Sequence, residues 1–101
     1  MNHFGLLVQL KISPGVKAKL LDKIPPVTES EIVESFANRT GKDLIDTREE
    51  HATDPPTRWF IAETDFGRSL KIVYLLTSEG VIIKTAYDPN IEELRIYKKY
   101  S

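Results

Sequence analysis

Three runs rich in β-branched and aromatic residues, separated by two short turns that contain glycine, constrain the fold of this 101-residue chain most strongly. They occupy residues 57–87, TRWFIAETDFGRSLKIVYLLTSEGVIIKTAY. Runs of this composition are typical of strands, and glycine-ended turns of this length join antiparallel neighbours. The turns are Asp65-Phe66-Gly67 and Ser78-Glu79-Gly80. This stretch predicts an antiparallel meander, and its last two strands should be central because they are apolar on both faces.

The N-terminal part predicts a strand and a short helix. Apolar and polar residues alternate in GLLVQLKIS, residues 5–13, as expected for a half-buried edge strand. Ser13 followed by Pro14 is a helix start, and Pro25 and Pro26 end that helix. Its apolar positions recur at a spacing of four residues: Val16, Leu20 and Ile24.

A capping box marks a second helix. Thr28 and Glu31 have the spacing in which each side chain binds the other residue's backbone N–H group. Residues 38–41, NRTG, supply the exit from this helix, and KDLIDTR at 42–48 is a further strand candidate. The expected staple and apolar stripe consist of Val27, Ile32, Val33, Phe36 and Ala37.

A last helix follows the meander and completes the predicted fold. Asp88-Pro89-Asn90 provides its cap. Its expected inward contacts are Ile91, Leu94 and Tyr97. The prediction is one α+β domain over 1–101, in which an antiparallel meander packs against two N-terminal helices and one C-terminal helix, with an extra N-terminal strand.

Composition limits the classes of function. Fourteen Lys and Arg residues against fifteen Asp and Glu residues give a net charge of −1, whereas domains that bind phosphates usually carry a basic surplus. Any basic patch must therefore arise from the way the fold arranges the charged residues. The chain has no cysteine, which excludes disulfides, thiolate nucleophiles and cysteine-bound zinc, and points to the cytoplasm. We expect no export signal and no membrane span.

The stretch 46–68 crowds cations around a Pro-Pro loop. Arg48, His51 and Arg58, together with Arg68 and Lys71, would present positive charge to an anionic substrate, with His51 as a proton carrier. A plain solvated hairpin is the competing interpretation, because mixed charge in a loop usually means weak pairing. The acids beside these cations are Glu49, Glu50 and Asp54.

Other common sites are not indicated. His3 and His51 are the only histidines and do not have the spacing of metal ligands, so neither a metal nor a cofactor is expected. No serine lies in a Gly-x-Ser-x-Gly motif, and the glycines do not form a phosphate-binding loop. These observations argue against serine hydrolases and nucleoside-triphosphate hydrolases.

Two aromatic features leave alternatives open. Trp59 and Phe60 are adjacent on a predicted strand, so one should enter the core while the other is free to stack a base beside Arg58. The tail YKKY, residues 97–100, places lysines where they suit the helix dipole, or forms an RNA-facing patch of lysines and aromatic rings.

Two segments, VTESEIVESF and RWFIAETDFGRSLKIVYLLTSEGVIIKTAYDPNIEELRIY, with their spacing, resemble the BrnT-type toxins. These toxins are relatives of the RelE superfamily of small ribonucleases in type II toxin–antitoxin pairs of bacteria. The similarity runs from Val27 to Tyr97. Short proteins of this kind are also labelled ADP-ribosyl-(dinitrogen reductase) hydrolases, but the enzymes that carry out that reaction resemble a much larger, all-helical, metal-dependent fold.

The resemblance implies a metal-independent endoribonuclease, an mRNA interferase, in which Arg and Lys neutralise the phosphate while another group transfers a proton. Its partners would be RNA and a cognate antitoxin protein, with no DNA binding by the chain alone and with oligomers allowed. The catalytic candidates are Arg58, Arg68, and His51 or Tyr87 for proton transfer. The substrate-binding candidates are Arg48, Lys71, Lys84, Glu93 and Tyr97.

One departure from the toxin pattern favours a second hypothesis. Where the toxins place an arginine after the last strand, this chain has Thr85-Ala86-Tyr87. The alternative is a non-catalytic BrnT-like binding or regulatory domain of the same fold.

Overall fold

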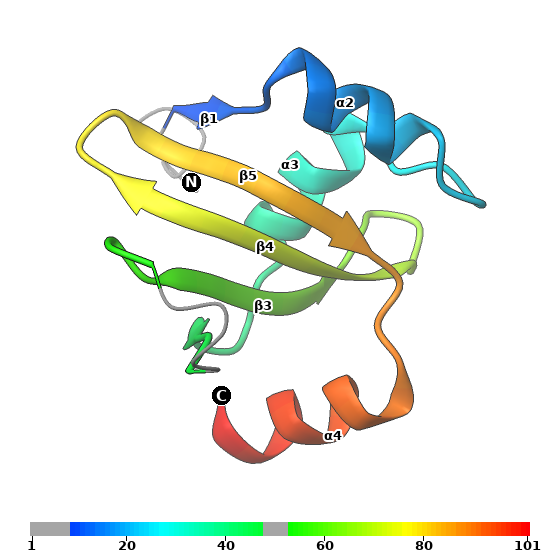
Figure 1. Ribbon diagram of the computed structural model, residues 1–101. Coiled ribbons are helices and arrows are strands. Elements are labelled where there is room, and N and C mark those ends of the chain that lie inside the picture. Colours follow the sequence, from blue (N-terminus) through cyan, green and yellow to red (C-terminus); the bar gives the residue numbers. More distant parts are fainter. Residues whose placement is uncertain (1–8, 48–52) are drawn as a thin grey trace.

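Five strands form one mixed sheet, and the predicted meander is its centre (Figure 1). The structure, a computed structural model, describes residues 9–47 and 53–101. The strand order is β1-β5-β4-β3-β2. The antiparallel meander consists of β3 (Thr57–Glu63), β4 (Ser69–Thr77) and β5 (Gly80–Tyr87). The α+β class and the interior positions of β4 and β5 are confirmed.

The two outer strands are short, and one of them changes the character of the sheet. β2 (Leu44–Ile45) pairs antiparallel with β3, as a meander neighbour should. β1 (Leu10–Lys11) instead pairs parallel with β5, a direction that the sequence left open. β1 and β5 are separated by most of the chain. Pairing between strands so far apart in the sequence leaves no local sequence signal. Leu6 and Val8, which the sequence placed in the first strand, lie outside the described residues.

Three helices begin where the capping signals place them. α2 (Pro14–Leu21) starts at Ser13, whose hydroxyl accepts a hydrogen bond from the Val16 N–H. α3 (Glu29–Ala37) has the predicted capping box of Thr28 and Glu31. α4 (Ile91–Tyr100) is capped by Asn90 with a second capping box. In each case a side chain satisfies a backbone N–H that the first helical turn leaves unpaired.

The core lies between the sheet and the two N-terminal helices. Phe60 is buried at its centre and meets the Phe36 ring edge to face, with 4.7 Å between the ring centroids. α4 packs on the opposite face of the sheet, where Tyr97 contacts Trp59 at 5.7 Å between ring centroids. Figure 1 shows α4 on the far side of β3 from α3. The buried residues that fill the core include Leu20, Val27, Ile32, Leu70, Ile72 and Tyr74.

Several residues expected in the core are exposed. Ile24 is 98% exposed because α2 ends at Leu21, which leaves Ile24 in the connection to α3. Ile91 is 75% exposed, because α4 rests on the sheet chiefly through Glu93 and Tyr97. The other positions at which this expectation is wrong are Val33, Ala37 and Leu94.

The turn before β5 gives a first test of the fold. Gly80 has φ of +124°, and a Cβ there would collide with the carbonyl of Gln9, which accepts a hydrogen bond from the Val81 N–H. We expect Gly80→Ala to lower the free energy of unfolding by about 2 kcal/mol, measured by urea denaturation.

The matched control is Gly15→Ala. A Cβ at this helical position meets nothing within 4 Å, so the substitution should stabilise the chain by about 0.5 kcal/mol. Equal effects of the two substitutions would contradict the described contact of Gly80 with Gln9.

Candidate functional site

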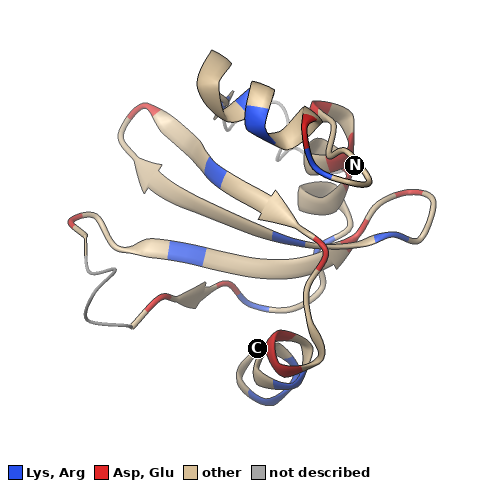
Figure 2. Cartoon of the chain, turned by 45° about the vertical axis from the view of Figure 1, so that its right-hand side comes forward, with Lys and Arg blue, Asp and Glu red and all other residues tan. Residues whose placement is uncertain are grey.

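The cations that the sequence grouped together do not meet in one pocket. Arg58 lies opposite Tyr74 in the β3–β4 ladder, whereas Lys71 is three residues away from Tyr74 on β4 and so points to the other face of the sheet. Arg68 precedes β4, six residues from Tyr74 and therefore about 20 Å along the strand. Figure 2 shows Lys and Arg spread over several elements. The expected single phosphate pocket of Arg58, Arg68 and Lys71 is not formed.

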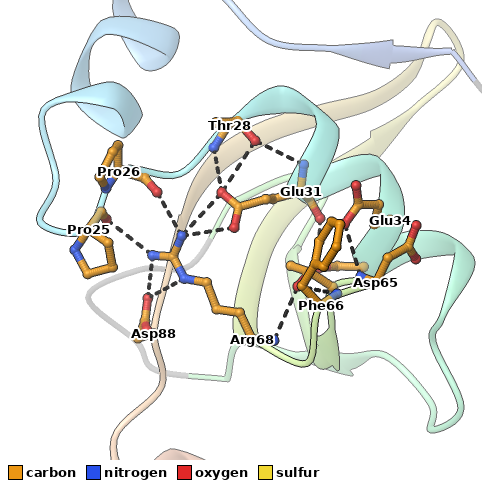
Figure 3. A network of polar contacts seen from close by, with 11 residues as sticks. Pro25, Pro26, Thr28, Glu31, Glu34, Asp65, Phe66, Arg68 and Asp88 are labelled. Carbon is orange, nitrogen blue, oxygen red and sulfur yellow. Dashed lines mark hydrogen bonds and ion pairs between the residues drawn. The ribbon is translucent and has the colours of Figure 1, made fainter.

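Arg68 is the centre of a dense polar network (Figure 3). Its Nη1 donates to both oxygens of Glu31 at 3.1 Å and to the Pro26 carbonyl at 2.7 Å. Its Nη2 donates to the Pro25 carbonyl at 3.1 Å and to Asp88 Oδ1 at 2.6 Å, while Nε donates to the same Asp88 oxygen at 3.1 Å. Every nitrogen of the guanidinium is thus committed to protein acceptors. Arg68 joins three segments of the chain and is not free to bind a substrate phosphate.

The ionisation of this network follows its hydrogen bonds. The hydrogen bond to Asp88 outweighs burial and raises the pKa of Arg68 further above its ordinary value. Burial opposes ionisation of Glu31, but hydrogen bonds from the Thr28 N–H and from Arg68 outweigh it, so the pKa of Glu31 is lowered. Both partners are therefore charged at neutral pH. The same Glu31 carboxylate caps α3 and pairs with Arg68.

Lys71 belongs to a second network on the opposite face. Its Nζ lies 2.8 Å from Glu93 Oε2, and the Tyr87 hydroxyl donates to the same oxygen at 2.7 Å. Lys71 Nζ also lies 4.4 Å from the centroid of the Trp59 ring. The side chain is buried, with its charge balanced by Glu93 and by the aromatic rings. This network fixes α4 to the sheet.

The pKa shifts in this second network agree with its role in fixing α4 to the sheet. Burial and the hydrogen bond to Glu93 raise the pKa of the Tyr87 hydroxyl, so Tyr87 stays protonated at neutral pH and acts as a donor. Burial opposes ionisation of Glu93, but the hydrogen bonds from Lys71 and from the Asn90 N–H lower its pKa. Tyr97, the other helix residue assigned to substrate, packs its ring against Trp59.

Arg58 lies in a different environment, a groove on the α3 side of the sheet. The groove has a volume of about 510 Å³ and is lined by two further cations, Arg39 and Lys42, and by the Phe36 and Tyr74 rings. Arg58 makes no hydrogen bond or ion pair with any described residue, and Lys42 is exposed. We call this feature the Arg58 groove. The complete lining is Phe36, Arg39, Gly41, Lys42, Asp43, Arg58, Tyr74, Leu76 and Val81.

The acid in the Arg58 groove is Asp43. Arg39 Nη1 binds its two oxygens at 2.8 and 2.9 Å, and the Arg39 guanidinium lies 5.2 Å from the centroid of the Phe60 ring. Burial raises the pKa of Asp43, against the opposing charges of Arg39 and Arg58. The groove therefore holds three cations and one carboxyl group, which suits it to an anionic ligand.

Sequence reasoning missed Arg39, Lys42 and Asp43. Arg39 lies in NRTG, which the sequence marked as a helix exit, and Lys42 and Asp43 begin KDLIDTR, which it marked as a strand candidate. The charged run across this junction was the available signal. Lys84 is exposed at an irregularity in the β4–β5 pairing and is not among the residues that line the groove. Arg48 and His51 lie outside the described residues.

Comparison of the chain with protein-family models, with curated proteins and with solved structures finds no match. Within residues 9–47 and 53–101, no group of three or more acidic or histidine side chains is placed to hold a metal ion. Over the same ranges, no helix has the length and apolar character needed to cross a bilayer. The function must therefore be argued from the geometry.

The Arg68 network predicts that replacing Arg68 lowers stability much more than replacing Arg58. We expect Arg68→Ala to lower the free energy of unfolding by about 3 kcal/mol, because it leaves Glu31 without its partner in a partly buried site. Arg58→Ala should change it by less than about 1 kcal/mol, because Arg58 has no direct partner among the described residues. Urea denaturation of both variants tests this, and equal losses would contradict the clamp role of Arg68.

The lowered pKa values of two carboxyl groups predict that the fold loses stability in acid. Glu31 and Glu93 bind protons more weakly in the folded chain than in the unfolded chain, so their stabilisation is present above their ordinary pKa of 4.5 and is lost as the pH falls below it. Unfolding curves from neutral to acidic pH should show this decline, and Glu93→Gln should flatten it. An unchanged slope in that variant would contradict the prediction.

Proposed function

We propose that this chain is a BrnT-like binding domain that holds the phosphodiester backbone of single-stranded RNA in the Arg58 groove. The observation that carries the proposal is an arginine without a hydrogen-bond or ion-pair partner among the described residues, beside two more cations. Guanidinium groups bind phosphate oxygens through paired N–H donors.

The distribution of charge supports this assignment despite the near-neutral total. The net charge of −1 would weaken phosphate binding if charges were evenly spread. Two cations are instead consumed inside the molecule, since Arg68 binds Glu31 and Asp88 while Lys71 binds Glu93. Lys42 and Arg58 then remain beside the Arg39–Asp43 ion pair at the end of α3. A local basic surface results from the arrangement of a balanced set of charges.

RNA binding has a direct test. Fluorescence anisotropy of a short labelled RNA without secondary structure should show binding at low salt that weakens on the order of tenfold in Arg58→Ala, with a salt slope smaller by about one. Arg95→Ala is the matched control, because Arg95 is an exposed arginine paired with Glu92 on α4. Wild-type affinity in Arg58→Ala would overturn the proposal.

Hydrolysis of the bound RNA is a second candidate function, and Asp43 favours it. Attack by a ribose 2′-hydroxyl needs a proton acceptor and positive charge at the phosphoryl oxygens, without a metal. Asp43 is a carboxyl group with a raised pKa beside Arg39 and Arg58. Of the catalytic residues inferred from the toxin resemblance, Arg58 keeps its assignment here, whereas Arg68 and Tyr87 act in the two networks. A cognate antitoxin and a cytoplasmic location remain part of this second proposal.

One variant distinguishes RNA binding from RNA hydrolysis. If the chain is a ribonuclease, its expression arrests bacterial growth and cleaves RNA, and Asp43→Asn abolishes cleavage while RNA still binds. Electrophoresis of the RNA used for anisotropy measures the cleavage. Intact RNA and normal growth with the unaltered chain would reject hydrolysis and leave the binding function standing.

A further inference from the structure

The Arg58 groove contains a carboxylate that opposes the binding of an anion. Asp43 is the one acid among the lining residues that the structure describes, and the other charged residues of this lining are Arg39, Lys42 and Arg58. The Asp43 side chain is only 14% exposed, so water shields its charge poorly. A phosphate that enters the groove therefore meets a like charge beside the cations that attract it.

Arg39 holds this carboxylate in place. It lies at the exit of α3, four positions before Asp43, and its Nη1 donates to both carboxylate oxygens at 2.8 and 2.9 Å. Carboxylate and phosphate oxygens accept hydrogen bonds from the same guanidinium donors. Asp43 therefore acts on a bound phosphate in two ways, because it repels the phosphate and competes with it for Arg39.

Titratable and charged groups from three elements act on Asp43. Arg39 follows α3, Arg58 lies on β3 and Tyr97 lies on α4. Arginine keeps its charge at every pH of interest. Burial, followed by the charge of Asp43, raises the pKa of the Tyr97 hydroxyl, so Tyr97 stays neutral. Asp43 is thus the member of this set whose charge changes between neutral and acidic pH, and burial raises its pKa toward neutrality.

We propose that Asp43 regulates the Arg58 groove: its negative charge weakens the binding of a polyanion, and its protonation strengthens that binding. The inference rests on the phosphodiester binding proposed for this groove. With Asp43 ionised, the lining carries three positive charges and one negative charge, and protonation removes the negative one. A bound phosphate favours the protonated carboxyl group, so binding and proton uptake are coupled.

Asp43→Asn tests this role through the anisotropy of a labelled single-stranded RNA. Asparagine keeps the shape of the side chain and one acceptor oxygen but carries no charge. At neutral pH the variant should bind RNA about tenfold more tightly than the unaltered chain. As the pH falls to about 5, the affinity of the unaltered chain should rise toward that of the variant, whose affinity should change little. This range stays above 4.5, the ordinary pKa of Glu31 and Glu93, so the fold keeps their stabilisation.

Glu29→Gln is the matched control. Glu29 begins α3, whereas the groove lies at the exit of that helix. Glu29 pairs with Lys17 at 3.2 Å, so this variant also removes a carboxylate from an ion pair and changes the net charge by the same amount. Its RNA affinity should stay within about twofold of that of the unaltered chain, because salt screens a distant exposed charge. Thermal unfolding verifies that both variants are folded.

The other outcomes overturn the proposal. Equal RNA affinity of Asp43→Asn and the unaltered chain would do so while leaving Arg58-dependent binding in place, as would equal tightening in Glu29→Gln. A pH dependence that persists in Asp43→Asn would assign the proton to another group, such as His3 or His51.

A second probe separates this inference from the proposed function. If RNA does not bind at all, the proposed function fails, and inorganic polyphosphate takes its place in calorimetric titrations. Tighter binding of polyphosphate by Asp43→Asn, lost when Arg58→Ala is added, would support the role of Asp43 by itself. Equal binding by the variant and the unaltered chain, or no binding by either, would overturn that role as well.

Discussion

The Arg68 guanidinium is the interaction on which the arrangement of this protein depends. It satisfies two backbone carbonyls that follow α2 and two carboxylates from α3 and from the start of the α4 connection. A turn between strands, the approach to α3 and the exit from β5 thereby become one rigid end of the molecule. The same contacts withdraw an arginine from ligand binding.

The two networks also explain how a nearly neutral chain acquires a basic groove. Burial makes an unpaired charge costly, so Lys71 on the covered face of the sheet takes Glu93 as its partner, and Arg68 takes Glu31 and Asp88. The acids that neutralise these cations lie on α3, on the connection after β5 and on α4. Arg58, at the opposite end of the β3–β4 ladder, keeps its charge available beside Arg39 and Lys42. Net charge alone therefore says little about local binding capacity.

The sequence predicted the fold where local rules act. The glycine turns, the capping box of α3, the cap of α4 and the three long strands depend on neighbours a few residues apart, and the structure has all of them. It did not predict the parallel pairing of β1 or the exposure of Ile24 and Ile91. Periodicity marks a residue as suited to burial, but only packing decides whether another element covers it. For the candidate site, Arg58 was identified in advance, whereas Arg39, Lys42 and Asp43 were not.

The sequence by itself determined the elements, their order and the starts of the helices, because helix caps, turn glycines and strand composition act through contacts between near neighbours. Only the tertiary structure decided which charged side chains pair within the protein and which remain available to a ligand. Arg68 and Glu31 are 37 positions apart, and nothing in either local sequence links them. Their pairing exists because the sheet and α3 bring them within hydrogen-bond distance in a partly buried site. The electrostatic character of the surface follows from that packing and not from the composition of the chain.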